Sequence, residues 1–453
     1  MVLVKRNSQP TLYDSMYKYV LVLIFITSTV LLFIYLNRVQ PYYFIDEMFH
    51  IPQTLQYCAR NFTVWDPKIT TLPGLYLLTA AILSPLNLCN ITYIRCINLF
   101  ATFANLYLTY FLIKQIRKDD KWDDWMQLGI AYNITMFPPL FFWFFLYYTD
   151  VVSVNVVLLM DSTNYFLPCY IGLLSILIRQ TNVIWVVFLA IERLIDLLHK
   201  HMRKPRTLLL WRSITDQAHH GKISFIKFLI EIGVNLCPHI IVGVIFLIFL
   251  IWNGGIVVGD RTAHIPVIHI PQIFYFFAFQ FCFLWPYMIP HWSKFFRSIQ
   301  EHWILSSIIF ALIVVIVHCN TLVHPYLLAD NRHYTFYIWN KFMGRYVFFK
   351  YMLIPVYCFT MYTTLYGINH VRFATQINFI LCTSIVLIPQ LLLEPRYFII
   401  PYIFYRLSMR KPKPWQIMME SLTTLVVNFL QFFIFINKVF YWEDQAHPQR
   451  ISW

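Results

Sequence analysis

Long apolar runs, separated by short polar loops, recur along almost the whole chain. A helix needs about 20 mostly apolar residues to cross a bilayer, and the runs are close to that length. They lie near residues 19–36, 96–113, 128–147, 151–167, 168–178, 183–198, 240–252, 273–289, 303–318, 350–366, 377–393, 397–409 and 417–436. Residues 1–453 are therefore predicted to form one all-α, polytopic membrane domain with about 12–14 transmembrane helices embedded in the lipid bilayer.

One further apolar stretch, residues 71–89, is broken by two prolines and a glycine, and it suits either a span or a helix on the membrane surface. Basic loops tend to face the cytosol. The five basic, motif-poor loops are 5–18, 114–121, 200–222, 294–297 and 406–413. These five loops lie on the same side of the membrane only if residues 71–89 do not cross it. We therefore expect a first span at 19–36, a long lumenal loop at 37–95, and the remaining spans and loops at 96–436.

Composition excludes several other classes of protein. Only 12% of the residues are charged, and the net charge of +14 fits basic cytosolic loops. No stretch interleaves Lys and Arg with stacking aromatics, so no nucleic acid partner is expected. The nine cysteines are scattered without a CxxC pair, which predicts neither a disulfide framework nor a zinc site. No GxGxxG motif or P-loop is present, and no cofactor is expected.

The loops on the predicted lumenal side gather most of the unusual polar residues. The first holds Asp46 and Glu47 directly after a span, followed by His50, Trp65 and Asp66. Two adjacent acids near lipid are costly unless they have a role. One of them can act as a general base that takes a proton from a sugar hydroxyl. The structural alternative is an acid at a helix N-terminus, and the sequence does not choose between the two carboxylates.

A second lumenal loop, downstream, concentrates charged and aromatic side chains. It contains Asp330, Arg332, His333, Tyr334 and Trp339. Arginine can neutralise a phosphate with two parallel hydrogen bonds, histidine can add positive charge, and aromatic rings can stack on sugar faces. The alternative is an interfacial aromatic belt with a snorkelling arginine.

Other lumenal turns hold further candidates. Arg396 is a second candidate phosphate contact, and a structural ion pair with Glu394 is an equally good interpretation. Candidate acceptor-binding residues in the remaining turns are Asp150, Arg179, Asp260 and His264. The histidines of that last turn are poorly spaced for a metal, and no metal site is expected.

Six segments resemble one family of membrane enzymes. IDEMFHIPQTLQYCARNFTVWDPKITTLPGLYL, LYYTD, RQTNVIW, NGGIVVGDRTAH, LLADNRHYTFYIW and EPRYFIIPY are similar to the dolichyl-phosphate-glucose-dependent alpha-1,2-glucosyltransferases of the endoplasmic reticulum. The resemblance runs from the first loop to the C-terminal part of the chain. It implies a GT-C type fold, membrane-parallel helices in the first lumenal loop, and catalysis without a metal.

The resemblance also implies a reaction. Glucose would pass, with inversion, from dolichyl phosphate glucose to the diglucosylated oligosaccharide on dolichyl diphosphate, as the last step before protein N-glycosylation. Asp46, with Glu47 as the substitute, would be the base, and Arg332, His333 and Arg396 would hold the donor phosphate. The rival readings are a transporter, which would place charges inside spans and show internal repeats, a non-enzymatic channel-regulating subunit, and a mannosyltransferase of the same fold.

Overall fold

The computed structural model describes residues 12–117, 122–162, 167–200, 222–261, 266–443 and 445–453. Regular structure in these residues is helical, apart from one antiparallel hairpin of β1 (Val439–Phe440) and β2 (Gln449–Arg450). The α-helices are α1 (Leu12–Val39), α2 (Glu47–Cys58), α3 (Gly74–Leu83), α4 (Ile91–Ile116), α5 (Asp124–Thr135), α6 (Pro138–Phe141), α7 (Thr149–Ser162), α8 (Leu167–Ile178), α9 (Val183–Lys200), α11 (Lys222–Asn253), α12 (Pro271–Met288), α13 (Trp292–Glu301), α14 (Trp303–Asn320), α15 (Pro325–Ala329), α16 (Tyr334–Ile338), α17 (Phe349–Met352), α18 (Ile354–Gly367), α19 (Phe373–Leu387), α20 (Ile399–Ser408) and α21 (Pro414–Asn437). Shorter turns are η1 (Ser84–Leu86), η2 (Phe142–Phe145), η3 (Gln180–Asn182), η4 (Ile289–His291), the π-helical η5 (Trp339–Met343) and η6 (Pro395–Phe398).

Every apolar run of the sequence overlaps at least one helix, and the chain is an all-α, multispanning membrane protein. Within the described residues, six helical stretches are long and apolar enough to cross a bilayer, and a seventh is a pair bent by 60°. The six are Met16–Val39, Ile91–Ile116, Phe225–Asn253, Pro271–Glu301, Trp303–Asn320 and Pro414–Asn437. The remaining runs form shorter helices. The ambiguous stretch at 71–89 forms the ten-residue α3 and the turn η1, which together are too short for a standard span.

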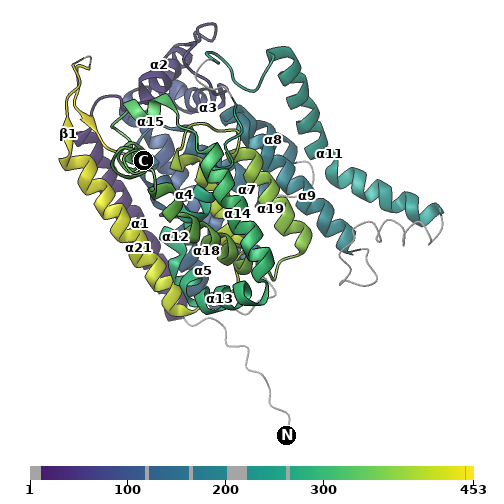
Figure 1. Cartoon of the computed structure of the whole chain (residues 1–453). Coiled ribbons are helices and arrows are strands. Elements are labelled where there is room, and N and C mark those ends of the chain that lie inside the picture. Colours follow the sequence, from purple (N-terminus) through teal and green to yellow (C-terminus); the bar gives the residue numbers. More distant parts are fainter. Residues whose placement is uncertain (1–11, 118–121, 163–166, 201–221, 262–265, 444) are drawn as a thin grey trace.

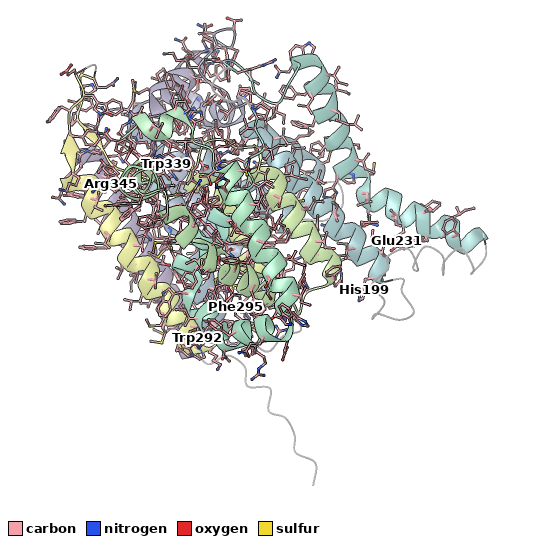
Figure 2. The ribbon with its side chains drawn as sticks, viewed as in Figure 1. His199, Glu231, Trp292, Phe295, Trp339 and Arg345 are labelled. Atoms are coloured by element: carbon pink, nitrogen blue, oxygen red, sulfur yellow. A yellow bond between two sulfur atoms is a disulfide. The ribbon has the colours of Figure 1, made fainter. Side chains whose placement is uncertain are left out.

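The helices form one bundle whose two ends differ. One end carries α2, α3, α15 and the hairpin strand β1, whereas α13 lies at the opposite end (Figure 1). α4 packs against α7 and α5, α7 packs against α8, and α21 packs against α5 and α12. Figure 2 shows Trp339 towards the first end and Trp292 and Phe295, on α13, at the other. The turns that precede α2, α7 and α9 can therefore come together at the first end of the bundle.

A disulfide between Cys58 and Cys89 closes the first loop, so the expectation of no disulfide was wrong. The two residues are 31 positions apart and carry no spacing signature. They meet because α2 and α3 pack against each other, which brings the end of α2 beside the turn that precedes α4. The bond ties down the loop that also holds Asp46.

Candidate active site

Asp46 occupies the N-cap position of α2, but its carboxylate makes no capping hydrogen bond to the helix. The preceding residue, Ile45, has a φ of 47°, a left-handed conformation that is strained for a β-branched residue. The Asp46 N–H donates to the Tyr148 hydroxyl over 3.1 Å, and this hydroxyl donates to the Phe44 carbonyl over 3.0 Å. The turn is therefore fixed through its backbone, which leaves the Asp46 side chain available to the site.

Arg396 holds the carboxylate of Asp46 and lies between three acids. Its Nη1 donates to Asp46 Oδ2 over 2.9 Å and lies 4.0 Å from Asp150 Oδ2. Its Nε and Nη2 contact the Glu394 carboxylate at 2.9–3.2 Å. The expected ion pair with Glu394 is therefore present together with the contact to Asp46.

Two aromatic rings support the same guanidinium, which lies 5.4 Å from the ring centre of Trp143 and 5.6 Å from that of Tyr148. Burial by itself raises the pKa of the Asp46 carboxyl, but the charge of Arg396 and its hydrogen bond to the carboxylate outweigh this effect, and the net pKa is lowered. Asp46 is therefore an ionised carboxylate at neutral pH, and 34% of its side chain is exposed.

Glu47, the adjacent acid, has a different environment. Its side chain is 0% exposed, as is that of its partner Arg95. Arg95 donates to both carboxylate oxygens, over 2.8 and 2.6 Å, and the backbone N–H groups of Phe44 and Tyr147 donate over 3.0 and 2.7 Å. Arg95 also donates to the carbonyls of Gln40 and Tyr42. Glu47 is thus a buried anchor that joins the first loop to α4 and to the turn before α7.

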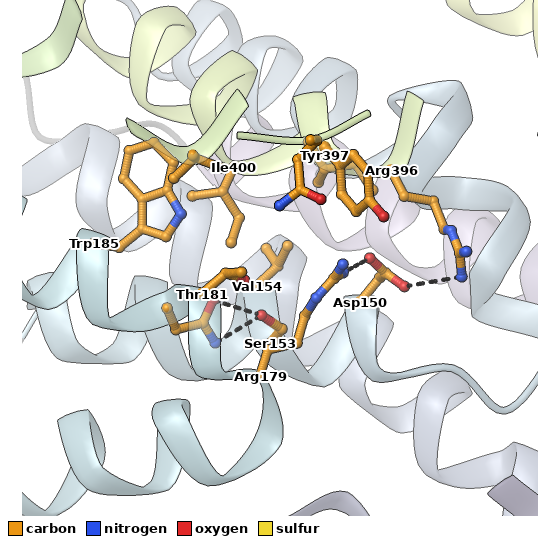
Figure 3. A pocket seen from close by; sticks show the side chains of 13 residues that line it. Asp150, Ser153, Val154, Arg179, Thr181, Trp185, Arg396, Tyr397 and Ile400 are labelled. Carbon is orange, nitrogen blue, oxygen red and sulfur yellow. Dashed lines mark hydrogen bonds and ion pairs between the residues drawn. The ribbon is translucent and has the colours of Figure 1, made fainter. Parts of the chain in front are cut away.

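Asp150 and Arg179 lie beside Arg396 and line a small cavity of about 30 Å³ (Figure 3). Arg179 pairs with one carboxylate oxygen of Asp150. The other, Oδ2, is buried and has no hydrogen-bond partner among the described residues. The Asn182 side chain bonds Ser153 and the Ser175 carbonyl, which fixes the turn after Arg179. This oxygen has an ion-pair contact with Arg396 at 4.0 Å but no hydrogen bond within the described residues, so it can accept one from a hydroxyl group or water.

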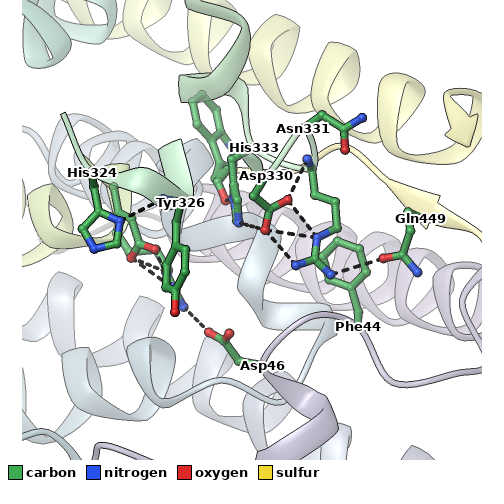
Figure 4. Close-up of polar contacts among 12 residues, drawn as sticks. Phe44, Asp46, His324, Tyr326, Asp330, Asn331, His333 and Gln449 are labelled. Carbon is green, nitrogen blue, oxygen red and sulfur yellow. Dashed lines mark hydrogen bonds and ion pairs between the residues drawn. The ribbon is translucent and has the colours of Figure 1, made fainter. Parts of the chain in front are cut away.

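The downstream loop folds over the same site and forms its own ion cluster (Figure 4). Arg332 contacts Asp330 through Nε and Nη2, over 2.9 and 2.7 Å, and lies 4.5 Å from the ring centre of Trp442. His333 Nε2 lies 3.7 Å from Asp330 Oδ2. Burial raises the pKa of Asp330, but its hydrogen bonds with Arg332 and the His333 charge lower it overall. The charge of His333 also contributes to the lowered pKa of Asp46. Asp46 of the first loop and His333 of the downstream loop therefore lie close enough to interact, whereas the Arg332 guanidinium is held within its own loop by Asp330.

Three other predicted residues lie in nearby loops, and two of them have a buried polar atom without a hydrogen bond to any other described residue. His50 Nδ1 is 2.6 Å from the Tyr76 hydroxyl, and burial lowers the pKa of His50, which favours the neutral ring. The Trp65 Nε1 and Tyr334 hydroxyl atoms are buried without a partner among the described residues. Such polar atoms are rare in native proteins unless water or a ligand satisfies them.

The structure places the remaining predicted residues farther out. Asp66 accepts a hydrogen bond from the Lys68 N–H in a local turn. Asp260 is exposed, and its N–H donates to the Pro67 carbonyl, so its turn is attached to the first loop. Trp339 is half-buried at the start of the π-helical turn η5. His264 lies outside the described residues.

Several site residues escaped the sequence analysis. Arg95 ends the predicted first loop, Trp143 lies inside an apolar run, and Tyr148 and Tyr397 belong to the quoted segments LYYTD and EPRYFIIPY, but none of the four was assigned a role. Arg95 carried a usable signal, because an arginine directly before an apolar run needs an acidic or polar partner near the membrane. The two tyrosines carried the signal of their motifs, whereas nothing set Trp143 apart in a chain that is 19% aromatic. Within the described residues, no group of three or more His, Cys, Asp or Glu side chains is placed to hold a metal ion.

Comparisons with known proteins give a consistent result. The model of the DIE2/ALG10 family matches residues 40–407. The chain is 37% identical over 450 residues to a Drosophila melanogaster protein named Dol-P-Glc:Glc(2)Man(9)GlcNAc(2)-PP-Dol alpha-1,2-glucosyltransferase, covering 96% of this chain and 99% of that protein. A Homo sapiens protein of the same name is 35% identical, over 91% of this chain and 93% of that protein. An Arabidopsis thaliana protein of the same name is 31% identical, over 93% of this chain and 96% of that protein. No solved structure matches the chain.

Proposed function

This chain belongs to the DIE2/ALG10 family, and on that premise we propose that it is a glucosyltransferase of lipid-linked oligosaccharide assembly. It moves glucose from dolichyl phosphate glucose to the diglucosylated oligosaccharide on dolichyl diphosphate and forms an alpha-1,2 linkage, the reaction in the names of its relatives. The all-α bundle is the GT-C type. The observation that carries the proposal is the ionised Asp46, which is held by Arg396 and lies near enough to His333 for the two to interact electrostatically.

Asp46 is the general base of this proposal. Its carboxylate is ionised, partly exposed and bound to a single cation in the described residues. It would take the proton of the acceptor hydroxyl as that oxygen attacks the anomeric carbon of the donor glucose. Glu47 is unsuited to this role, because four hydrogen bonds already occupy its buried carboxylate.

The leaving group is a phosphate ester, which needs positive charge rather than a proton. Arg396, together with Arg332 and His333, would provide it in a partly buried site where electrostatic contacts are strong. Binding of this phosphate competes with Asp46 for Arg396. As the guanidinium turns to the phosphate, the pKa of Asp46 rises, and the carboxylate becomes a stronger base when the donor is in place. Asp150, with its unpaired oxygen, and the aromatic residues beside it would bind sugar hydroxyls and faces.

We propose that the protein resides in the membrane of the endoplasmic reticulum with this site facing the lumen. The Cys58–Cys89 disulfide supports this side, because disulfides persist in oxidising compartments. The basic residues Lys294 and Arg297 belong to α13, at the opposite end of the bundle, as the excess of positive charge on cytosolic loops predicts.

The direct test uses the purified full chain in lipid vesicles with synthetic dolichyl phosphate glucose and a diglucosylated lipid-linked acceptor. The expected product gains one hexose, and linkage analysis finds a terminal alpha-1,2 glucose. Dolichyl phosphate mannose is the matched donor control and should give no product. Transfer of mannose would favour the mannosyltransferase reading. Absence of any covalent product, under conditions where a Drosophila relative is active, would overturn the proposal.

A further inference from the structure

Residues 449–453 form a short segment, here called the clamp segment, that packs against the downstream loop. Two backbone hydrogen bonds join them: the Ser452 N–H donates to the Arg332 carbonyl over 2.7 Å, and the Tyr334 N–H donates to the Ser452 carbonyl over 3.1 Å. The pairing makes a parallel β-bridge between His333 and Ser452. The backbone on both sides of His333 is therefore fixed by the clamp segment.

The clamp segment also holds the side chains of Arg332 and His333. Arg332 Nη1 donates to Gln449 Oε1 over 3.3 Å. His333 Nδ1 lies 2.8 Å from the Trp453 carbonyl, and because a carbonyl only accepts, Nδ1 carries a proton. Nε2 is then the ring nitrogen that remains available for a contact in the site. The Trp453 ring packs edge-on against Tyr334, with 5.2 Å between ring centres.

Arg450 anchors the clamp segment to the ends of two membrane helices. Its guanidinium donates to the Phe435 and Ile436 carbonyls of α21, both over 2.8 Å, and to the Val39 carbonyl of α1 over 3.2 Å. The last carbonyls of a helix have no partner within it, so one side chain satisfies both helix ends. Its Nε also donates to Gln40 Oε1, and the Gln40 carbonyl accepts from Arg95, the partner of Glu47.

We propose that the clamp segment is a positioning element of the active site, which fixes Arg332 and His333 for the donor phosphate and relates them to the loop of Asp46. The inference rests on the proposed function. Gln449, Ser452 and Trp453 act through the two cations, so they are positioning residues rather than catalytic ones. The segment lies outside every predicted motif and beyond residue 407, where the family match ends.

The test compares pairs of variants at two positions. Ser452→Pro removes the N–H that binds the Arg332 carbonyl, and Ser452→Ala keeps it. Gln449→Ala removes the side-chain oxygen that binds Arg332, and Gln449→Glu keeps one. Loss of one hydrogen bond to a charged group should weaken binding about tenfold. We expect Ser452→Pro and Gln449→Ala each to raise the KM for dolichyl phosphate glucose about tenfold. The KM for the acceptor should be unchanged, and Ser452→Ala should stay near wild type. Gln449→Glu keeps the oxygen but adds a negative charge that competes with the phosphate for Arg332, so it should also raise the donor KM.

Thermal unfolding of the same samples separates positioning from general stability. If Ser452→Pro fails to fold, the Gln449 pair decides. A purely structural segment would lower the melting temperature or the yield and leave the donor KM of the folded fraction unchanged, and that result would overturn the inference. If wild-type protein transfers no glucose, the proposed function itself fails; if it does and both donor KM values stay normal, only the positioning role fails.

Discussion

At the scale of single residues, Asp46 and Glu47 are neighbours in one motif but lie in very different environments. Asp46 is exposed to the site and held by a cation 350 residues away in the sequence, whereas Glu47 is fully enclosed by Arg95 and two backbone N–H groups. The sequence predicted that one of them is functional. It could not choose, because the choice depends on Ile45 and on the helix start at Glu47, which turn the two side chains in different directions.

Substitution of the two acids should have different consequences. Asp46→Asn should reduce kcat by about 10²–10⁴-fold, the range expected for loss of general base catalysis, while the protein remains folded. Glu47→Gln should instead lower the yield and the melting temperature, because breaking a buried ion pair costs about 3–5 kcal/mol. Transfer assays and thermal unfolding of both variants check this.

The matched control for these acids is Asp123→Asn, at an exposed acid directly before α5, which should keep normal rates. If Asp46→Asn keeps a near-normal kcat in folded protein, the general base is another group.

The pH dependence of stability follows from the lowered pKa of Asp46. Because Arg396 stabilises the charged form in the folded protein, the contribution of Asp46 is complete above its unfolded pKa of about 3.9 and is lost as the pH falls through the folded value. Wild type should therefore exceed Asp46→Asn in melting temperature by a constant amount from pH 7 to about pH 5, and by less towards pH 3. A difference that grows as the pH falls contradicts the Asp46–Arg396 pair.

At the scale of elements, polar side chains inside apolar helices form hydrogen bonds that fix the turns of the candidate site. Asn98, in α4, donates to the carbonyls of Leu146 and Tyr148 over 2.7 and 2.9 Å. These carbonyls belong to the turn that presents Asp150 and the aromatic support of Arg396. Apolar periodicity predicted the helices themselves, but the hydrogen bonds that set where each one stops are made between elements far apart in the sequence.

Asn98→Leu should therefore weaken both the fold and the reaction. It leaves two buried carbonyls without a donor, at a cost of about 1–3 kcal/mol each, and it releases the turn that holds Trp143 and Tyr148. We expect a lower melting temperature and a kcat reduced about tenfold or more. Asn235→Ala, at an exposed position of α11, is the control and should change neither quantity. Normal activity in folded Asn98→Leu would show that the turn needs no such support.

The disulfide is a second element-scale prediction. Closing a loop of 31 residues is worth about 3–4 kcal/mol in the chain-entropy model. The double variant Cys58→Ser/Cys89→Ser should lower the melting temperature, and it should abolish the shift in gel mobility that reduction causes in wild type. Cys282→Ser, at an exposed free cysteine, should preserve both. A wild-type chain with two free thiols at these positions would contradict the pairing.

At the scale of the whole molecule, the sorting of loops by side was the most informative part of the sequence. The loops predicted to be lumenal supply Asp46, Asp150 and Arg396, which meet in one ion cluster, and the loop of Arg332 follows α15 at the first end of the bundle. Which of them pair could not be predicted, since pairing depends on the packing of α4, α7 and η6. The clamp segment was missed because it has neither an apolar run nor a recognisable motif.

The side of the membrane can be tested directly in sealed microsomes. A protease-cleavable epitope inserted after Thr63, in the exposed part of the first loop, should be protected from added protease until detergent opens the membrane. The same epitope before Met1 should be cut at once, because the basic N-terminal segment is expected in the cytosol. Cleavage at both positions without detergent would contradict the proposed orientation.

The three carboxylates around Arg396 have a consequence for turnover. The donor is a phosphodiester with one negative charge, but the dolichyl phosphate left after transfer is a monoester that carries up to two. Once the proton on Asp46 has passed to water, that acid regains its charge and competes with the product phosphate for Arg396, beside Glu394 and Asp150. Deprotonation of Asp46 thus resets the cluster around Arg396 and favours exit of the spent lipid into the bilayer.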